Sequence, residues 1–198
     1  MKTAPTPGFA DPVLSAQSSF RALMAAMARP GRICALTEPV AAPRQLSHAA
    51  AVVALALCDQ DTPVWLDAGL AGTDVPYWLR FHTGAPIVSE TRRAAFAFLA
   101  EPQNAPPFDA FPLGTAEYPD RSATLVLQVE SLEDGPTLTL SGPGIKGQSM
   151  IRARPLPQDF GHRLVNNRAL FPRGVDLLLV TDTAIAALPR SVQLADEP

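Results

Sequence analysis

The sequence predicts an α/β protein with three layers (α/β/α), in which helices cover both faces of a mixed β-sheet. Residues 175–180 form an almost unbroken apolar run, which is typical of a central strand buried on both faces. Apolar residues recur with helical spacing over residues 12–28, and another helix is predicted at residues 157–170, so helices come before and after strands of the predicted sheet. The 198 residues show no internal repeat or boundary, so we expect one domain over residues 1–198.

The first predicted helix covers residues 12–28. Asp11 supplies an N-terminal cap, and Pro12 fits the first turn, where the backbone N–H that it lacks has no partner within the helix. Apolar side chains follow at intervals of three and four residues, and Arg29-Pro30-Gly31 ends the pattern. We expect a short strand near residues 32–36 to come next.

A second helix is predicted over residues 48–57, with Ser47 as its cap. This segment is apolar on nearly all sides, so we expect it to lie deep in the core. The elements predicted between this helix and the centre of the chain are a strand at 64–67, a helix at 74–82, a strand at 94–99, where a helix is also open, and a proline-bearing loop at 104–112.

The centre of the chain predicts a three-stranded antiparallel meander. Apolar and polar residues alternate there, and a glycine-rich turn separates the last two strands. The expected strands are residues 124–132, 137–141 and 148–154. Phe171-Pro172-Arg173-Gly174 ends the helix that follows, and a short turn at residues 183–188 is expected after the buried strand.

Composition excludes several classes of protein. With a formal net charge of −3 and a pI of about 5.6, the chain lacks the basic surface of a dedicated nucleic-acid-binding protein. The longest wholly apolar stretch, residues 49–58, is about half the length that a membrane span needs. Cys34 and Cys58 are isolated, so we expect free thiols in a cytoplasmic protein. Charged residues make up 18%, against about 25% in an average soluble domain, so we expect another chain to cover part of the surface.

Residues 142–147 read Gly-Pro-Gly-Ile-Lys-Gly, which matches the pattern G-x-G-x-x-G. A dinucleotide site also needs a helix after the glycines and an acidic residue about twenty positions later. Here a strand is predicted after the glycines and Asn167 stands at that distance, so we interpret the segment as a tight turn. A second interpretation stays open, in which the glycine amides and Lys146 contact a phosphate of a ligand shared with a partner.

Neither a pyridoxal-phosphate cofactor nor a metal ion is predicted. Lys146 is the only lysine after Lys2, and a Schiff-base lysine needs a dry pocket that lowers its pKa. A flexible glycine turn is a poor place for such a pocket. The three histidines, His48, His82 and His162, are far apart and lack the spacing of metal ligands.

Arginines gather in the last third of the chain, and paired N–H groups of arginine are able to bind a phosphate or a phosphonate. Residues 121–198 hold eight basic and eight acidic side chains, so we favour salt bridges to a partner and solvation over anion binding. Asp182 follows the buried strand, where ligands of α/β sheets bind, or it caps the turn after it. No catalytic residue is assigned, and the candidate ligand-binding residues are Lys146, Arg152, Arg154 and Asp182. The other arginines of this group are Arg163, Arg168 and Arg173.

Extended phrases, spread over almost the whole chain, are more informative than any single motif. They are Gly8-Phe9-Ala10-Asp11-Pro12-Val13, Phe20-Arg21-Ala22-Leu23-Met24, Ala26-Met27-Ala28-Arg29-Pro30-Gly31, Phe81-His82-Thr83-Gly84, Tyr118-Pro119-Asp120-Arg121-Ser122-Ala123-Thr124, Leu140-Ser141-Gly142-Pro143-Gly144-Ile145, Phe171-Pro172-Arg173-Gly174-Val175-Asp176 and Leu188-Pro189-Arg190. In this order and spacing they resemble the PhnH family, the H subunits of the bacterial carbon–phosphorus lyase system.

The resemblance implies a fold similar to that of pyridoxal-phosphate-dependent transferases, without the cofactor. It also implies partners, because H subunits belong to a core complex with G, I and J subunits that serves organophosphonate catabolism. The G, H, I and L subunits support transfer of an alkylphosphonate to ribose C1 of ATP with release of adenine, and the J subunit later cleaves the carbon–phosphorus bond. The family offers no catalytic motif that can be transferred to this chain.

Two functions are compatible with these observations. The first is a non-catalytic, accessory subunit that is inactive alone and, when isolated, forms a two-fold homodimer, the commonest closed oligomer. The second is a subunit whose own residues bind ATP or phosphonate in an active site shared with its partners. The small charged fraction and the lack of a catalytic constellation favour the first.

Overall fold

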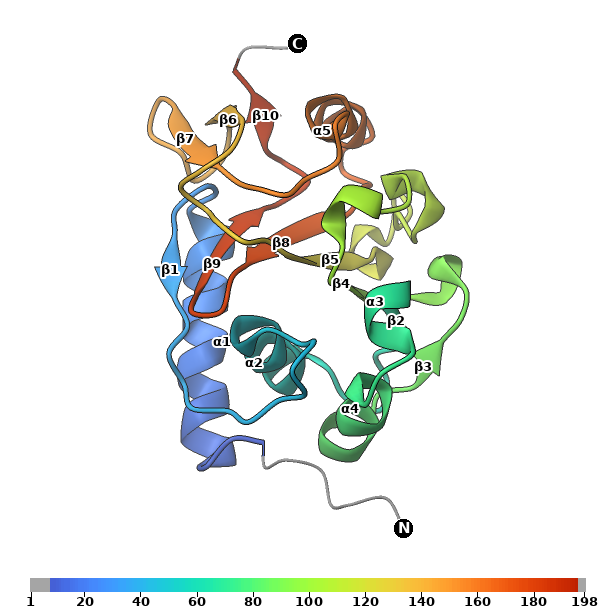
Figure 1. Ribbon diagram of the computed structural model, residues 1–198. Helices are drawn as coiled ribbons and strands as arrows, with labels where there is room; N and C mark the ends of the chain where they lie inside the picture. The colour runs from blue at the N-terminus through green and yellow to red at the C-terminus, as the bar shows by residue number, and fades with distance from the viewer. Residues whose placement is uncertain (1–7, 196–198) are drawn as a thin grey trace.

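The computed structural model describes residues 8–195, and Figure 1 shows β-sheets with helices on either side. The helices are α1 (Pro12–Ala28), α2 (His48–Leu57), α3 (Ala68–Ala71), α4 (Val75–Thr83) and α5 (Phe160–Ala169), with short 3-10 helices η1 (Thr91–Arg93), η2 (Pro102–Asn104), η3 (Phe108–Ala110) and η4 (Pro119–Arg121). The strands are β1 (Cys34–Ala35), β2 (Val64–Leu66), β3 (Ile87–Val88), β4 (Phe96–Leu99), β5 (Thr124–Gln128), β6 (Thr137–Ser141), β7 (Ser149–Arg152), β8 (Asp176–Val180), β9 (Ala184–Leu188) and β10 (Gln193–Leu194). Within the described range, no helix has both the length and the apolar character that a membrane span requires.

The larger sheet is mixed, as predicted. Its seven strands lie in the order β1-β9-β8-β5-β4-β2-β3. β3, β2, β4, β5 and β8 are parallel to one another. β9 is antiparallel to β8, and β1 is antiparallel to β9. β8 lies between β5 and β9 and is buried from Leu177 to Val180, which confirms the central strand predicted from its apolar run. Residues 96–99, where the sequence left strand and helix open, form β4.

Two hydrophobic cores lie on the two faces of this sheet. On one face, Leu23 of α1 and Trp78 of α4 pack in one cluster with α2 and with Val126 of β5. On the other face, Phe160 of α5 packs in a second cluster with Leu125 of β5 and with the smaller sheet. Figure 1 shows α1, α2 and α4 on one side and α5 with β6, β7 and β10 on the other. The fold therefore has three layers, but its second outer layer combines a helix with a small sheet rather than helices alone.

The two N-terminal caps predicted from the sequence, Asp11 and Ser47, are confirmed. The Asp11 carboxylate accepts hydrogen bonds from two backbone N–H groups of α1, at 3.1 and 3.0 Å. The Ser47 hydroxyl accepts one from the amide of Ala50 at 3.3 Å. Residues 49–54 of α2 are all buried, as the apolar sequence of this helix predicted.

The predicted three-stranded meander is wrong. β5 lies in the larger sheet, parallel to both β4 and β8, whereas β6 and β7 pair antiparallel in a separate three-stranded sheet of order β10-β6-β7. The reason is burial: Leu125, Val126 and Leu127 are all fully buried, so both faces of β5 need cover. On β6, Thr137 is exposed and Thr139 is half-buried on one face, whereas Leu140 on the other face is buried, which suits a sheet with one face on the core and the other toward solvent.

The turn expected at residues 183–188 is also wrong, because residues 184–188 form β9. Four consecutive residues from Ile185 to Leu188 are buried, and they pair antiparallel with residues 177–180 of β8. Asp182 consequently does not cap a turn of that kind and lies, exposed, in the short connection between β8 and β9. A strand pairs where both of its faces are suitably buried or solvated. Its partner strand is therefore set by the whole fold rather than by the neighbouring sequence.

The glycine-rich segment is a tight turn, as interpreted. Residues 142–147 connect β6 to β7, and Gly142, Gly144 and Gly147 have φ angles of 124°, 83° and 76°. These values lie in the region that glycine enters without steric cost. A strand follows the turn, so the helix that a dinucleotide fingerprint requires is not there.

The two cysteines differ in burial: Cys34 is half-buried and Cys58 is buried. Both are free thiols, as predicted. Cys58 is buried after α2, and this burial raises the pKa of its thiol to about 12. The reactive thiolate of Cys58 is therefore not formed near neutral pH.

We expect a substitution of Ser19 to stabilise the fold. It lies on the inner face of α1 with 1% of its surface exposed, and its hydroxyl has no hydrogen-bond partner among the described residues. We expect Ser19→Ala to raise the free energy of unfolding by about 1 kcal/mol, because it removes an unsatisfied buried hydroxyl and improves helix propensity. The urea midpoint measures this gain. Ser18→Ala is the matched control, since the Ser18 hydroxyl donates to the carbonyl of Ser15 at 3.2 Å and to Glu38; a loss of stability in Ser19→Ala would contradict the prediction.

Candidate functional site

The four residues predicted to bind a ligand lie at three places. Arg152 and Arg154 are close together, at and just beyond the end of β7. Lys146 is exposed in the turn at the opposite end of the β6–β7 hairpin, because Thr137 pairs with Arg152 at the end away from that turn. Asp182 lies in the β8–β9 connection.

The guanidinium group of Arg154 is occupied by two carboxylates. Its Nε donates to Asp134 at 2.6 Å and its Nη1 to Glu130 at 2.7 Å. The hydrogen bond from Arg154 is the main cause that lowers the pKa of Asp134, and the same contact raises the pKa of Arg154. Arg152 donates from Nε to the Thr137 hydroxyl at 3.1 Å. Arg152 therefore braces the β6–β7 hairpin, and Arg154 ties the segment after β7 to the connection between β5 and β6.

Asp182 lines a cavity of about 420 Å³ together with Glu130 and Glu133. Three carboxylates at one cavity repel an anionic ligand, and Arg154 neutralises only Glu130. This geometry does not favour phosphate or phosphonate at Asp182. The ligand-binding role of Lys146, Arg152, Arg154 and Asp182 stays a prediction.

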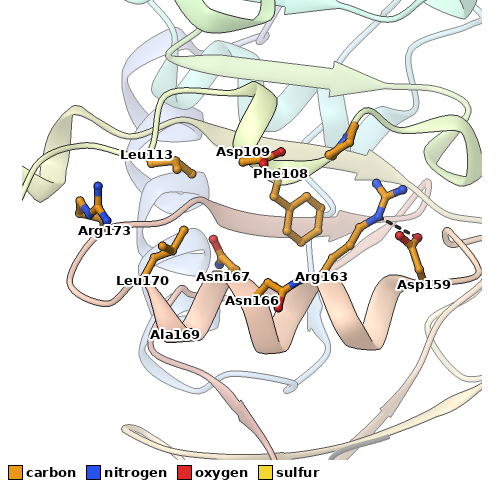
Figure 2. A pocket seen from close by; sticks show the side chains of 11 residues that line it. Phe108, Asp109, Leu113, Asp159, Arg163, Asn166, Asn167, Ala169, Leu170 and Arg173 are labelled. Atoms are coloured by element: carbon orange, nitrogen blue, oxygen red, sulfur yellow. Dashed lines mark hydrogen bonds and ion pairs between the residues drawn. The ribbon is translucent and has the colours of Figure 1, made fainter.

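A larger cavity, of about 690 Å³, lies between α5 and the segment that contains η3 (Figure 2). Its volume falls within the range of small-molecule sites. We call it the α5 cavity and define it by its lining residues. They are Pro107, Phe108, Asp109, Leu113, Asp159, Arg163, Asn166, Asn167, Ala169, Leu170 and Arg173.

The middle of the α5 cavity is lined by apolar side chains, of which Phe108 is packed firmly against α5. Phe108 is 5% exposed and meets Phe160 of α5 edge to face, with ring centroids 6.0 Å apart. Figure 2 shows Phe108 between the two ends of the cavity, with Leu113 and Leu170 toward one end. This contact fixes η3 on the helix, because the sequence places an aromatic residue in each element at the point where they meet.

Arg163 holds the wall at one end. Its Nε donates to the carboxylate of Asp159 at 2.8 Å, one helical turn away, and its Nη1 donates to the carbonyls of Ala105 and Pro106 at 2.9 and 3.0 Å. The proline-bearing loop, which has few donors of its own, is thereby tied to α5. In the described part of the chain, the Nη2 group of Arg163 donates no hydrogen bond.

A tight turn forms the opposite end and presents Arg173. The amide of the buried Asn167 donates to the carbonyl of Val175 and accepts from its N–H, both at 2.9 Å. Gly174, at a φ of 127°, donates to the carbonyl of Leu113 at 2.8 Å. These bonds fix the backbone on both sides of the turn, so Arg173 projects from a rigid base.

Three polar side chains of the α5 cavity are exposed and, within residues 8–195, make no hydrogen bond or ion pair: Asp109, Asn166 and Arg173. The sequence pointed to Arg163 and Arg173 only as members of a group of arginines. It gave no signal for Asp109 or Asn166, because the cavity joins a loop to a helix about fifty residues later. Among the described residues, no cluster of three or more histidine, cysteine or acidic side chains is arranged to hold a metal ion.

Comparison with known proteins places the chain in a family. The family model for the bacterial phosphonate metabolism protein PhnH matches residues 7–195. A protein of Rhizobium meliloti (strain 1021), named alpha-D-ribose 1-methylphosphonate 5-triphosphate synthase subunit PhnH, is 49% identical over 189 residues, which cover 96% of this chain and 94% of that protein. A protein of Stutzerimonas stutzeri, named putative C-P lyase subunit protein HtxG, is 35% identical over 82 residues, 41% of this chain and 42% of its own. The predicted resemblance is confirmed, and the chain belongs to the PhnH family of bacterial phosphonate metabolism proteins.

Proposed function

We propose that this chain is an accessory subunit of the carbon–phosphorus lyase core complex and is inactive alone. With G, I and J subunits it supports the step in which a phosphonate oxygen bonds to ribose C1 of ATP while the bond from that carbon to adenine breaks. The observation that carries the proposal is the 49% identity, over 96% of this chain, to a protein whose name makes it a subunit of such a synthase. A cytoplasmic location and a fold similar to that of pyridoxal-phosphate-dependent transferases form part of the proposal.

The surface of the chain supports a subunit role. Charged residues make up only 18% of the sequence, and the outer side of α1 exposes large apolar side chains. Val13, Phe20 and Met24 are 76%, 46% and 44% exposed, and their spacing of seven and four residues puts them on one side of the helix. Apolar side chains gathered in this way are typical of surfaces that another protein covers.

Co-expression tests the proposal. We expect the tagged full-length chain to co-purify with its G, I and J subunits, with a fixed stoichiometry in native mass spectrometry. The isolated chain is expected to run as a homodimer, at twice its mass of 21.0 kDa, in light scattering after size exclusion. A soluble chain that stays monomeric and never co-purifies with folded partners would contradict the subunit role.

A second candidate function is a subunit that contributes its own ATP- or phosphonate-binding residues to a shared active site. The α5 cavity favours it, because that cavity has the volume of a small-molecule site and unpaired polar groups at its rim. Alanine variants of Lys146, Arg152, Arg154 and Asp182 test the residues predicted from the sequence. Turnover that is lost in an assembled complex supports their role, and unchanged turnover removes it.

A further inference from the structure

The guanidinium group of Arg173 is placed to bind a ligand rather than to stabilise the fold. It is exposed at one end of the α5 cavity and makes no hydrogen bond or ion pair with any described residue. Its backbone, by contrast, is fixed: Arg173 donates to the carbonyl of Leu170 at 3.0 Å, and the next residue donates to Leu113 at 2.8 Å. Because the backbone is already fixed, binding would order the side chain alone, and its planar pair of donors matches a phosphate or phosphonate.

The other polar groups at the rim of the α5 cavity, Asp109 and Asn166, are suited to hydroxyl groups on the same ligand. Figure 2 shows Asp109 on the wall that faces α5, and Asn166 on α5 itself. The Asp109 carboxylate only accepts hydrogen bonds near neutral pH, so it repels an anion and binds a hydroxyl group. The amide of Asn166 donates and accepts, and the Nη2 group of Arg163 offers donors at the far end. An inorganic anion alone would satisfy Arg173 and leave the other groups unpaired.

The apolar middle fits a compact carbon skeleton. Phe108, Leu113 and Leu170 line the space between the polar ends. A sugar ring presents C–H groups to such a surface and directs its hydroxyls to the rim. Ligand sites of this size combine an apolar lining with a few polar groups that fix orientation.

We propose that the α5 cavity binds a phosphorylated pentose, with the phosphate on Arg173 and the sugar hydroxyls on Asp109 and Asn166. The preference for a pentose among hydroxylated phosphates rests on the proposed function, whose product carries ribose. Arg163 positions the wall of the site through its bonds to the carbonyls of Ala105 and Pro106.

Isothermal titration calorimetry on the full-length chain tests this proposal, with ribose 5-phosphate, methylphosphonate and inorganic phosphate as probes. We expect ribose 5-phosphate to bind at least about tenfold more tightly than either small anion, which lacks the hydroxyl groups. Arg173→Ala is expected to weaken it about tenfold or more, the effect of losing a charge-assisted pair. Asp109→Asn is expected to weaken ribose 5-phosphate but not methylphosphonate, since the anion no longer meets a like charge.

Arg92→Ala is the matched control, because Arg92 is an exposed arginine in η1 that does not line the cavity. Arg173→Lys retains the charge without the paired donors and should fall between wild type and Arg173→Ala. Circular dichroism confirms that each variant is folded. The proposal is overturned if ribose 5-phosphate does not bind, if it binds no better than inorganic phosphate, or if Arg173→Ala binds as Arg92→Ala does.

This titration and the co-expression experiment fail independently. The titration uses the chain without its partners, so assembly does not enter the result. A chain that assembles with G, I and J subunits but binds no pentose phosphate overturns the ligand site alone. A chain that binds ribose 5-phosphate through Arg173 but never assembles overturns the subunit role alone.

Discussion

Replacing Arg190 with alanine is expected to lower the free energy of unfolding by about 3 kcal/mol, the loss typical of breaking a buried ion pair from one side. The Nε of Arg190 donates to Asp176 at 3.1 Å, and its Nη2 pairs with the same carboxylate and donates to the Ser122 hydroxyl. Its Nη1 donates to the carbonyl of Pro119. Both charged side chains are only 14% exposed, so water does not replace the lost donors. Asp176 would keep its charge with only the Arg190 backbone N–H, at 2.8 Å, as donor.

Urea unfolding followed by circular dichroism measures this loss, at one protein concentration because self-association adds to apparent stability. Arg154→Ala is the matched control: Arg154 also contacts two carboxylates, but its side chain is half exposed, so we expect a small change. Arg190→Lys should recover only part of the loss, since the compact ammonium of lysine lacks the planar, paired donors that Arg190 directs at Asp176 while it also reaches Pro119 and Ser122. Equal midpoint shifts in the two alanine variants would contradict this account of Arg190.

The Arg190 contacts also join separate phrases of the sequence that carried the family resemblance. Arg190 ends the last phrase, Asp176 ends the phrase that starts at Phe171, and Pro119 with Ser122 belongs to the phrase that starts at Tyr118. Three phrases far apart in sequence thus meet in one cluster of hydrogen bonds. These three phrases are therefore also contact points of the fold.

Another pair of phrases meets near the N-terminus. A Cβ atom on Gly8 would lie 3.0 Å from Nδ1 of His82, so the first phrase packs closely on the one that contains His82. Nothing in the sequence pointed to Gly8 as the neighbour of His82. Contacts of this kind depend on how α4 and the start of the chain come together, which local patterns do not encode.

Local physical chemistry explains what the sequence predicted well. The caps at Asp11 and Ser47 and the burial of β8 follow from side chains acting on their own backbone or from apolar content alone. The sheet that receives β5, and the formation of β9, depend on partners elsewhere in the chain, and both predictions were wrong. The α5 cavity could not be predicted from the sequence for the same reason, because Arg163 forms its wall by donating to the distant carbonyls of Ala105 and Pro106.

The glycine-rich turn supplies a second test with a large expected effect. We expect Gly144→Ala to lower the free energy of unfolding by about 3 kcal/mol, from the strain of alanine at positive φ together with overpacking. Gly144 has a φ of 83°, and a Cβ there would lie 2.3 Å from the carbonyl oxygen of Ala28 and 3.0 Å from Cδ of Pro30. The turn between β6 and β7 therefore rests directly on the end of α1, with no room for a methyl group.

Gly147→Ala, in the same turn, measures the effect of backbone strain without the effect of close packing. Gly147 has a similar φ of 76°, but a Cβ there would meet nothing within 4 Å, so we expect a loss of only about 1 kcal/mol. Urea midpoints of the two variants measure the difference. If both lose the same stability, backbone strain alone explains the glycines and the turn does not bear on α1. If Gly144→Ala loses clearly more, the pattern G-x-G-x-x-G in this chain reflects close packing between α1 and the smaller sheet, and a nucleotide is not needed to explain it.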